Sequence, residues 1–330
     1  MLGFFSSHCV LRNSLDLKFK ALPLSRERGL KMVCGAFYIS KAKESKPQGD
    51  DAHFICAEKQ TVGVADGVGG WSKSGVDAGQ YARGLMANCV KAIENVEKSE
   101  VDPRWVLDEA YRNTNVEGSS TACILTLKNN VSVFSFLYFL FLLAFQFGSL
   151  VMLTTRIDNA VGYPDYLSCL CYGIREGICN SLSCEHVVVA NVGDSGFMVI
   201  REGKEVFKSN IQQRRFNCPY QLGNKTSSDR PNVAQLYRTP VVPGDVIVMG
   251  TDGLLDNMFS EDICHIVKMI TESSSEPEQA AWAIAEHAYN NSVDSLAPTP
   301  FTQASLMAGK DHLGGKADDI TVIVAYVVMK

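Results

Sequence analysis

The stretch DVIVMGTDG, residues 245–253, joins an apolar run to an acidic residue and a glycine. The run from Asp245 to Gly250 is typical of a central strand of a sheet. Asp252 then follows the strand, and Gly253 lets the backbone turn sharply and approach a ligand closely. A carboxylate cannot be buried without a positive partner, because its desolvation is too costly. The stretch therefore predicts a buried strand with a cation at its end.

Four other aspartate clusters occur along the chain, most of them at the ends of apolar runs. They are GDDA (49–52), VADG (64–67), NVGD (191–194) and KADD (316–319). One Asp-Gly pair is a common hairpin signal, but its repetition favours a shared site. Oxygen ligands select hard divalent cations, so we expect Mn²⁺ or Mg²⁺ and not zinc, which prefers Cys and His. Such sites usually support phosphoryl or hydrolytic chemistry.

Composition narrows the class of protein. The chain has 330 residues, 46% of them hydrophobic, which is ample for a core. Its net charge of -5 and the absence of a basic stripe argue against nucleic-acid binding. The eleven cysteines are scattered, which indicates a reducing compartment. We expect a monomer whose partner is its substrate.

The first 35 residues differ from the rest of the chain. Residues 1–31 hold six Lys or Arg against Asp16 and Glu27, with several serines. This basic composition suits an organelle transit peptide, and a disordered tail is the alternative. The sequence predicts no clear strand in this range, and the folded domain is expected over residues 36–330.

The apolar patterns beyond the tail predict strands and helices in alternating blocks. Strands are expected at 53–58, 61–65, 119–127, 186–192, 197–201, 204–207, 245–250 and 320–328. Helices are expected at 76–96, 102–113, 261–270 and 276–290. The strands form antiparallel-looking pairs, which favours an α+β sandwich over a βαβ array.

Taken together, the motifs resemble a known family. The ordered set GDDAHF, VADGVGGW, GSSTAC, ANVGDSGF, GTDGLLDNM and GGKADDITVIV is similar to the PPM (type 2C) metal-dependent serine/threonine protein phosphatases. VADGVGGW (64–71) and FNCPYQL (216–222) resemble the organelle-targeted branch, in plants and in animal mitochondria. The resemblance implies a four-layer αββα sandwich, with a dinuclear metal site at one end. It also implies a chloroplast or mitochondrial location, the cytoplasm being the alternative.

The resemblance further implies hydrolysis of phosphoserine and phosphothreonine in a protein, by a water that bridges two Mn²⁺ or Mg²⁺ ions. Asp66 would bridge both ions and Gly67 would offer its carbonyl oxygen. Asp252 and Asp318 would hold the first ion, and Asp51 would anchor the second through water. The resemblance also implies that Asp194 holds a third, more weakly bound metal ion. Residues that would orient the metal ligands are Asp50, Asp256 and Asp319.

Two positions depart from the family pattern. Many members carry a histidine after the Asp-Gly, where it is proposed to protonate the leaving group. Val68 stands there in this chain, so the general acid is open. The arginine that binds substrate phosphate in other members has no clear match, and Lys46 is our candidate, with Lys43 and Lys41 as alternatives. A lysine offers a point charge in place of the bidentate fork of an arginine.

An insertion at 129–185 interrupts the family pattern. Val131–Leu153 is apolar and uncharged, long enough to span a membrane. One span would separate Asp51 and Asp66 from the other ligands, so membrane association is disfavoured. Our preferred interpretation is that 129–184 is not part of the evolved fold, such as a translated intron. The second interpretation is a surface loop that the fold tolerates. Two weaker interpretations are an inactive or membrane-associated isoform and a zinc knuckle. The zinc knuckle would use Cys169, Cys171, Cys179 and Cys184.

Overall fold

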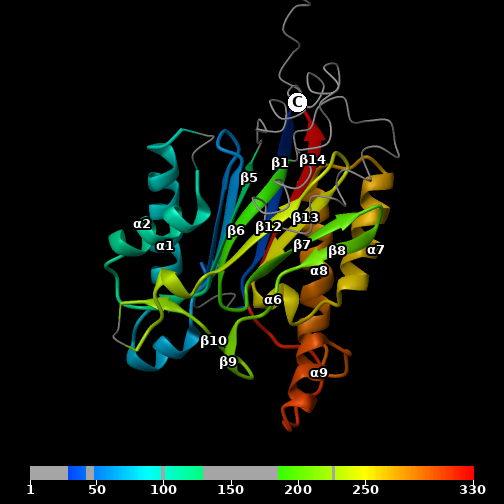
Figure 1. Cartoon of the computed structure of the whole chain (residues 1–330). Coiled ribbons are helices and arrows are strands. Elements are labelled where there is room, and N and C mark those ends of the chain that lie inside the picture. Colours follow the sequence, from blue (N-terminus) through cyan, green and yellow to red (C-terminus); the bar gives the residue numbers. More distant parts are fainter. Residues whose placement is uncertain (1–28, 42–47, 98–100, 129–184, 225–226) are drawn as a thin grey trace, which may run out of the picture.

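The computed structural model describes residues 29–41, 48–97, 101–128, 185–224 and 227–330. Two five-stranded antiparallel sheets form its centre, with helices on both outer sides (Figure 1). The first sheet has the order β1 (Leu30–Ile39), β14 (Ile320–Met329), β13 (Val246–Gly250), β7 (Gly196–Arg201) and β8 (Lys204–Lys208). The second has the order β12 (Gln235–Pro240), β6 (His186–Val192), β5 (Ala122–Lys128), β3 (Thr61–Asp66) and β2 (Asp51–Cys56). The expected αββα sandwich is confirmed.

Four long helices form the outer layers. Helices α1 (Ala78–Glu94) and α2 (Pro103–Asn113) pack on the second sheet. Helices α7 (Ser260–Glu272) and α8 (Pro277–Val293) pack on the first. Both α1 and α2 begin at an aspartate whose side chain accepts a backbone N–H, Asp77 from Gly79 and Asp102 from Arg104. These caps agree with the helix starts that the sequence predicts.

The central strands β13, β5 and β7 are buried on both faces. In β13, Ile247 and Met249 point into the core between the two sheets, while Val246 and Val248 face the helices. Alternate residues of a strand point to opposite faces, so a central strand needs apolar residues at every position. Cys56, Cys89, Cys123 and Cys264 lie in apolar segments, which predicts that they are small core residues; Cys89, Cys123 and Cys264 are buried, and Cys56 is partly buried.

Strand β1 begins inside the range 1–35, for which the sequence predicts a tail. It begins at Leu30, and Leu30 and Met32 are buried in the core between the sheets. It pairs with β14 along its whole length, from Leu30 opposite Met329 to Ile39 opposite Ile320. The expected domain start at residue 36 is therefore too late. The partner strand lies at the other end of the chain, so local pattern gives little sign of it.

Several shorter elements also escaped the sequence analysis. Besides β12, they are the small strands β9 (Gln213–Arg215), β10 (Cys218–Pro219) and β11 (Leu222–Gly223), the 3₁₀ helices η1 (Gly69–Ser74) and η4 (Pro231–Val233), and the helices α6 (Asp252–Leu255) and α9 (Pro300–Met307). The strand predicted at 119–127 is divided into β4 (Ser119–Ser120) and β5. The β9–β10 pair and α9 lie at the same end of the sandwich as α6 (Figure 1).

The strands on either side of the insertion are direct neighbours. β5 pairs antiparallel with β6, and Lys128 at the end of β5 lies opposite His186 at the start of β6. The chain therefore leaves and re-enters the sheet at adjacent positions. The apolar run Val131–Leu153 and the four cysteines of the possible zinc knuckle lie outside the described residues. Of the helices within the described ranges, none is both long enough and apolar enough to cross a membrane.

Candidate metal centre

The five aspartate clusters meet at one end of the sandwich. In the second sheet, Asp51 begins β2 and lies opposite Asp66, which ends β3. Asp194 occupies the turn between β6 and β7. In the first sheet, Asp252 follows the end of β13 and Asp318 precedes the start of its antiparallel neighbour β14. Ends and starts of antiparallel strands alternate along one edge of a sheet, which is why clusters far apart in sequence converge.

Three carboxylates form the tightest group. Asp66, Asp194 and Asp252 each offer one oxygen, and these oxygens lie within 4.8 Å of one another. Burial, followed by repulsion from Asp252 and Asp51, raises the pKa of Asp66 well above its usual value. Burial also raises the pKa of Asp194 to about 6. Carboxylates crowded in this way favour a bound cation, because it removes both the desolvation cost and the repulsion.

Asp51 is held beside this group by two threonines from the other sheet. Its Oδ2 accepts hydrogen bonds from Thr251 Oγ1 at 2.8 Å and Thr321 Oγ1 at 2.7 Å. Burial raises the pKa of Asp51 to about 8, although both hydroxyls oppose the shift. Thr251 directly precedes Asp252, so the contact also ties the two strand ends together.

Three buried carboxylate oxygens are left for a ligand. Within the described part of the chain, the Oδ1 atoms of Asp51, Asp194 and Asp252 accept no hydrogen bond. Buried polar atoms are almost always paired in folded proteins, so unpaired acceptors that converge in one place require a partner. A hard divalent cation fits this donor set of oxygens. The residues present therefore fit the metal that the sequence predicts.

Lys316 places an ammonium group among the carboxylates. Its Nζ donates to Asp252 Oδ2 and to Asp256 Oδ2, the latter at 2.8 Å, and lies 3.4 Å from Asp318 Oδ2. Asp256 ends α6 one turn after Asp252. The sequence analysis assigned no role to Lys316. Its position in the KADD cluster, beside two predicted site residues, is the one signal that points to it.

Lys41 supplies a second ammonium group on the other side of Asp318. Its Nζ donates to Asp318 Oδ1 at 2.5 Å and lies 3.7 Å from Asp50 Oδ2. Burial acts to raise the pKa of Asp318, but the charges of Lys316 and Lys41 outweigh it and leave that pKa below its usual range. Asp318 therefore differs from Asp66, Asp194 and Asp252, because its pKa is lowered where the pKa values of those three are raised.

Asp319 and Gly67 shape the backbone around the centre. Asp319 accepts hydrogen bonds from Asp50 N and Lys41 N, both at 2.7 Å, and so fixes the chain that leads into β2. Gly67 N donates to Asp50 O at 3.0 Å. A Cβ at Gly67 would lie 2.3 Å from Ala78 O, so the close approach of these segments requires glycine.

The structure describes Val68, which stands in place of the family's histidine, and one of the three lysines considered in place of its arginine. Val68 N donates to Ser119 O at 3.0 Å, and its aliphatic side chain carries no proton to donate. Lys46 and Lys43 lie outside the described residues. Lys41 is the one of the three candidate lysines that the described residues place beside the aspartates.

A comparison with models of known protein families finds no match. Among curated proteins, the chain is 39% identical over 298 residues to the probable protein phosphatase 2C 55 of Arabidopsis thaliana, covering 90% of this chain and 52% of the relative. It is 32% identical over 295 residues to the protein phosphatase PTC7 homolog fig of Drosophila virilis, covering 84% and 77%. It is 30% identical over 300 residues to the human PTC7 homolog, covering 86% and 81%.

Two solved structures of phosphatases also match most of this chain. The photosystem II phosphatase PBCP matches with a TM-score of 0.68 and 26% identity, over 89% of this chain and 98% of that one. The catalytic domain of the serine/threonine phosphatase PstP, in complex with two manganese ions, matches in fold with a TM-score of 0.51 and 15% identity, over 91% of this chain and 99% of that one. The chain spans between half and two thirds of the length of two Arabidopsis relatives, 52% and 59%.

Proposed function

Because this chain belongs to the protein phosphatase 2C family, we propose that it is a metal-dependent phosphatase acting on phosphoserine and phosphothreonine in proteins. The observation that carries the proposal is the convergence of Asp66, Asp194 and Asp252 with three buried, unpaired carboxylate oxygens. Mn²⁺ or Mg²⁺ held there would make water a good nucleophile at neutral pH and neutralise charge on the phosphate. Phosphoryl transfer needs chiefly positioning and charge stabilisation, and this centre supplies both.

The proposed ligand set keeps the residues expected from the sequence. Asp66 would serve both of two metal ions and Gly67 would offer its carbonyl oxygen, while Asp252 and Asp318 would hold one ion and Asp51 would anchor the other through water. Thr251 and Thr321 hold Asp51 in place, so its free Oδ1 has a fixed direction. We assign Asp194 to a third, weaker metal.

Three further residues orient this set. Asp319 holds Asp50 and the segment before β2, which supports its assignment as an orienting residue. Asp256 is held by Lys316 and supports Asp252 from the same short helix.

For the substrate phosphate, the sequence favours Lys46, and we propose Lys41 as the cation in its place, with Lys46 as the alternative. Lys41 already lies beside Asp318 and Asp50, at the rim of the carboxylate group. Its side chain is 34% exposed, so it can meet a ligand from solvent. The leaving group would take its proton from water, since Val68 offers none.

An organelle location is proposed on weaker grounds. The basic composition of residues 1–28 and the likeness to a photosystem II phosphatase support a chloroplast, and the likeness to animal PTC7 proteins supports a mitochondrion. We further propose that the protein acts as a monomer on phosphoprotein substrates.

The deciding experiment is Mn²⁺-dependent phosphate release from a phosphopeptide, by the full chain and by a variant that lacks residues 129–184. The adjacent positions of Lys128 and His186 allow a short turn to close the deletion. Activity in both, abolished by EDTA, supports an active enzyme with a tolerated insertion. Activity in the shortened chain alone supports the inactive-isoform alternative. A folded shortened chain without activity would refute the phosphatase proposal.

A further inference from the structure

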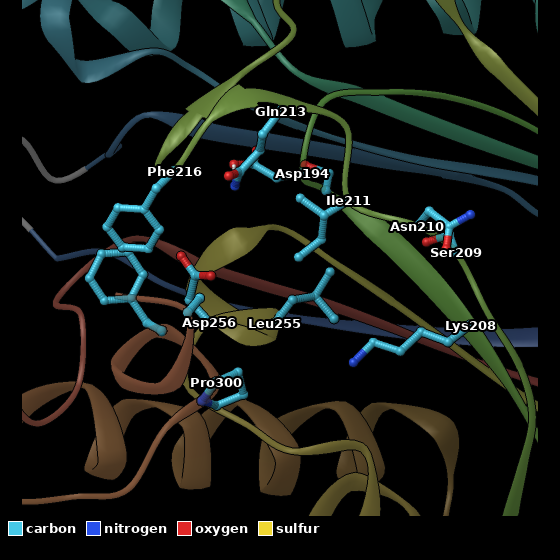
Figure 2. A pocket seen from close by; sticks show the side chains of 13 residues that line it. Asp194, Lys208, Ser209, Asn210, Ile211, Gln213, Phe216, Leu255, Asp256 and Pro300 are labelled. Atoms are coloured by element: carbon cyan, nitrogen blue, oxygen red, sulfur yellow. Dashed lines mark hydrogen bonds between the residues drawn. The ribbon is translucent and has the colours of Figure 1, made fainter. Parts of the chain in front are cut away.

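A small cavity lies beside the metal centre and shares Asp194 and Asp256 with it. It has a volume of about 120 Å³. Its walls come from the segment between β8 and β10, from the end of α6 and from α9. Figure 2 shows Asp194 and Asp256 on the same cavity as the apolar side chains of Ile211, Phe216 and Leu255. The cavity therefore adjoins the carboxylates of the centre directly.

The cavity is fixed to the metal centre by specific contacts. Phe301 N, in α9, donates to Asp256 O at 2.9 Å. The centroid of the Phe301 ring lies 5.3 Å from Lys316 Nζ. It lies 5.1 Å from the centroid of the Phe216 ring. Phe216 thus joins the β9–β10 hairpin to α9 across the cavity. These contacts hold the cavity walls at a fixed position relative to the carboxylates, so a substrate bound at the centre would lie next to them.

The apolar part of the cavity wall can hold an apolar group. Seven of the lining residues are polar or charged, namely Asp194, Ser195, Lys208, Ser209, Asn210, Gln213 and Asp256, and six are apolar. The six are Ile211, Phe216, Leu255, Pro300, Phe301 and Ala304. An apolar cavity of roughly 150 Å³ holds a benzene molecule, so this one fits an aliphatic side chain such as leucine. Ile211 is 54% exposed at the edge of the cavity, so a ligand from solvent can contact it.

We propose that this cavity is a specificity subsite, which takes one aliphatic side chain of the phosphoprotein close to the phosphorylated residue. The inference rests on the proposed phosphatase function. Consecutive Cα atoms lie about 3.8 Å apart, so a residue next to the phosphoresidue, or one position further, reaches a cavity that touches Asp194. The ligand is the substrate chain itself, because the cavity opens beside the atoms that would receive its phosphate.

The test uses phosphoserine peptides of alanine and serine, in which one leucine is placed in turn at each of the two positions on either side of the phosphoserine. The measured quantity is the ratio of kcat/KM for each leucine peptide to that of the parent peptide, with Mn²⁺. This ratio is independent of the fraction of active enzyme. We expect a rise of about tenfold at one position, through KM, because a hydrophobic pocket discriminates apolar groups by about that factor.

Two variants assign the preference to the cavity. Ile211→Asp puts a charge at its edge, and Ala304→Phe fills it; both are expected to bring the ratio close to one. Leu306→Asp is the matched control, because Leu306 is 55% exposed on α9 and does not line the cavity. It is expected to keep the leucine preference.

Each result has a defined meaning. A leucine preference that both cavity variants abolish and the control retains supports the subsite. Dephosphorylation of all peptides at equal efficiency overturns the subsite and leaves the phosphatase function standing. A preference that survives Ile211→Asp and Ala304→Phe also overturns it, since the selectivity then arises elsewhere. Failure to release phosphate from any peptide and from p-nitrophenyl phosphate refutes the proposed function itself.

Discussion

Lys316 Nζ lies 2.8 Å from Asp256 Oδ2, and the same ammonium group donates to Asp252. Its side chain is 14% exposed. Burial alone would lower the pKa of Lys316, but Asp252, Asp256 and Asp318 raise it above its ordinary value. The protein thus carries a permanent cation against the oxygens that are proposed to bind metal. This cation stabilises the metal-free centre and competes with the metal for the charge of the aspartates.

We expect Lys316→Met to lower the stability of the metal-free protein and to tighten Mn²⁺ binding. The variant leaves buried carboxylates without a partner, which costs about 3 kcal/mol of unfolding free energy. The same uncompensated charge attracts Mn²⁺ more strongly. Denaturant unfolding in EDTA measures the first effect, and calorimetric titration with Mn²⁺ measures the second. Lys310→Met, at an exposed lysine, is the control. Weaker Mn²⁺ binding by the variant would mean that Lys316 supports the metal and does not compete with it.

Asp66→Asn is expected to stabilise the metal-free protein while it removes metal binding. Burial and neighbouring carboxylates raise the pKa of Asp66, so its charge opposes folding when no cation is present. A neutral amide relieves that cost, by about 1 to 3 kcal/mol. The melting temperature in EDTA should therefore rise, while the increase that Mn²⁺ causes in the wild type should disappear. Asp311→Asn, at an exposed aspartate, should change neither value. A fall in metal-free stability would contradict this assignment of the repulsion.

The aspartates of the site could be predicted because each lies at the end of an apolar run. A strand such as Val246–Gly250 fixes where its next residues emerge, so Asp252 could be placed at an edge from local sequence alone. Antiparallel pairing then brings Asp318 to the same edge. The role of Lys316 could not be predicted in this way. It depends on which carboxylates surround its ammonium group, and those come from separate segments.

The elements that the sequence did not reveal are held by distant contacts. β1 is a long strand, yet it owes its place to β14 and α8 at the far end of the chain. The β9–β10 hairpin and α9 are short, and Phe216 and Phe301 pack against each other with little local periodicity around either. The cavity between them therefore has no signature in the sequence. It appears only when the fold brings its walls together.

Asp245 and Asp252 flank the same strand but are predicted to respond differently to substitution. Asp245 is fully buried and forms a bidentate pair with Arg201, at 2.7 and 2.9 Å, and it also accepts Val242 N at 2.9 Å. Asp245→Ala removes the bidentate carboxylate that Arg201 contacts and the acceptor of Val242 N, and should cost about 3 kcal/mol of unfolding free energy. Mn²⁺ affinity of the folded variant should stay unchanged, because this residue lies at the opposite end of the strand from the metal centre.

The control for this prediction is Asp108→Ala. Asp108 pairs with Arg112 on the surface of α2, where both side chains are well exposed. Exposed pairs of this kind contribute about 0.5 kcal/mol or less. Urea unfolding of the two variants beside the wild type separates the buried pair from the exposed one. Equal losses in both would show that burial of Asp245 adds nothing to its contribution.

Removal of residues 1–39 is expected to destroy the fold, whereas removal of 1–28 should leave it intact. The longer deletion takes away β1, whose Leu30 and Met32 are buried in the core between the sheets. It also exposes the edge of β14, the strand that follows Asp318, and an unpaired edge promotes aggregation. Circular dichroism and thermal unfolding of both deletions test this directly. A cooperative transition at the wild-type temperature in the longer deletion would mean that β1 is dispensable. A loss of structure in the shorter one would show that residues before Leu30 carry more than the tail predicted for them.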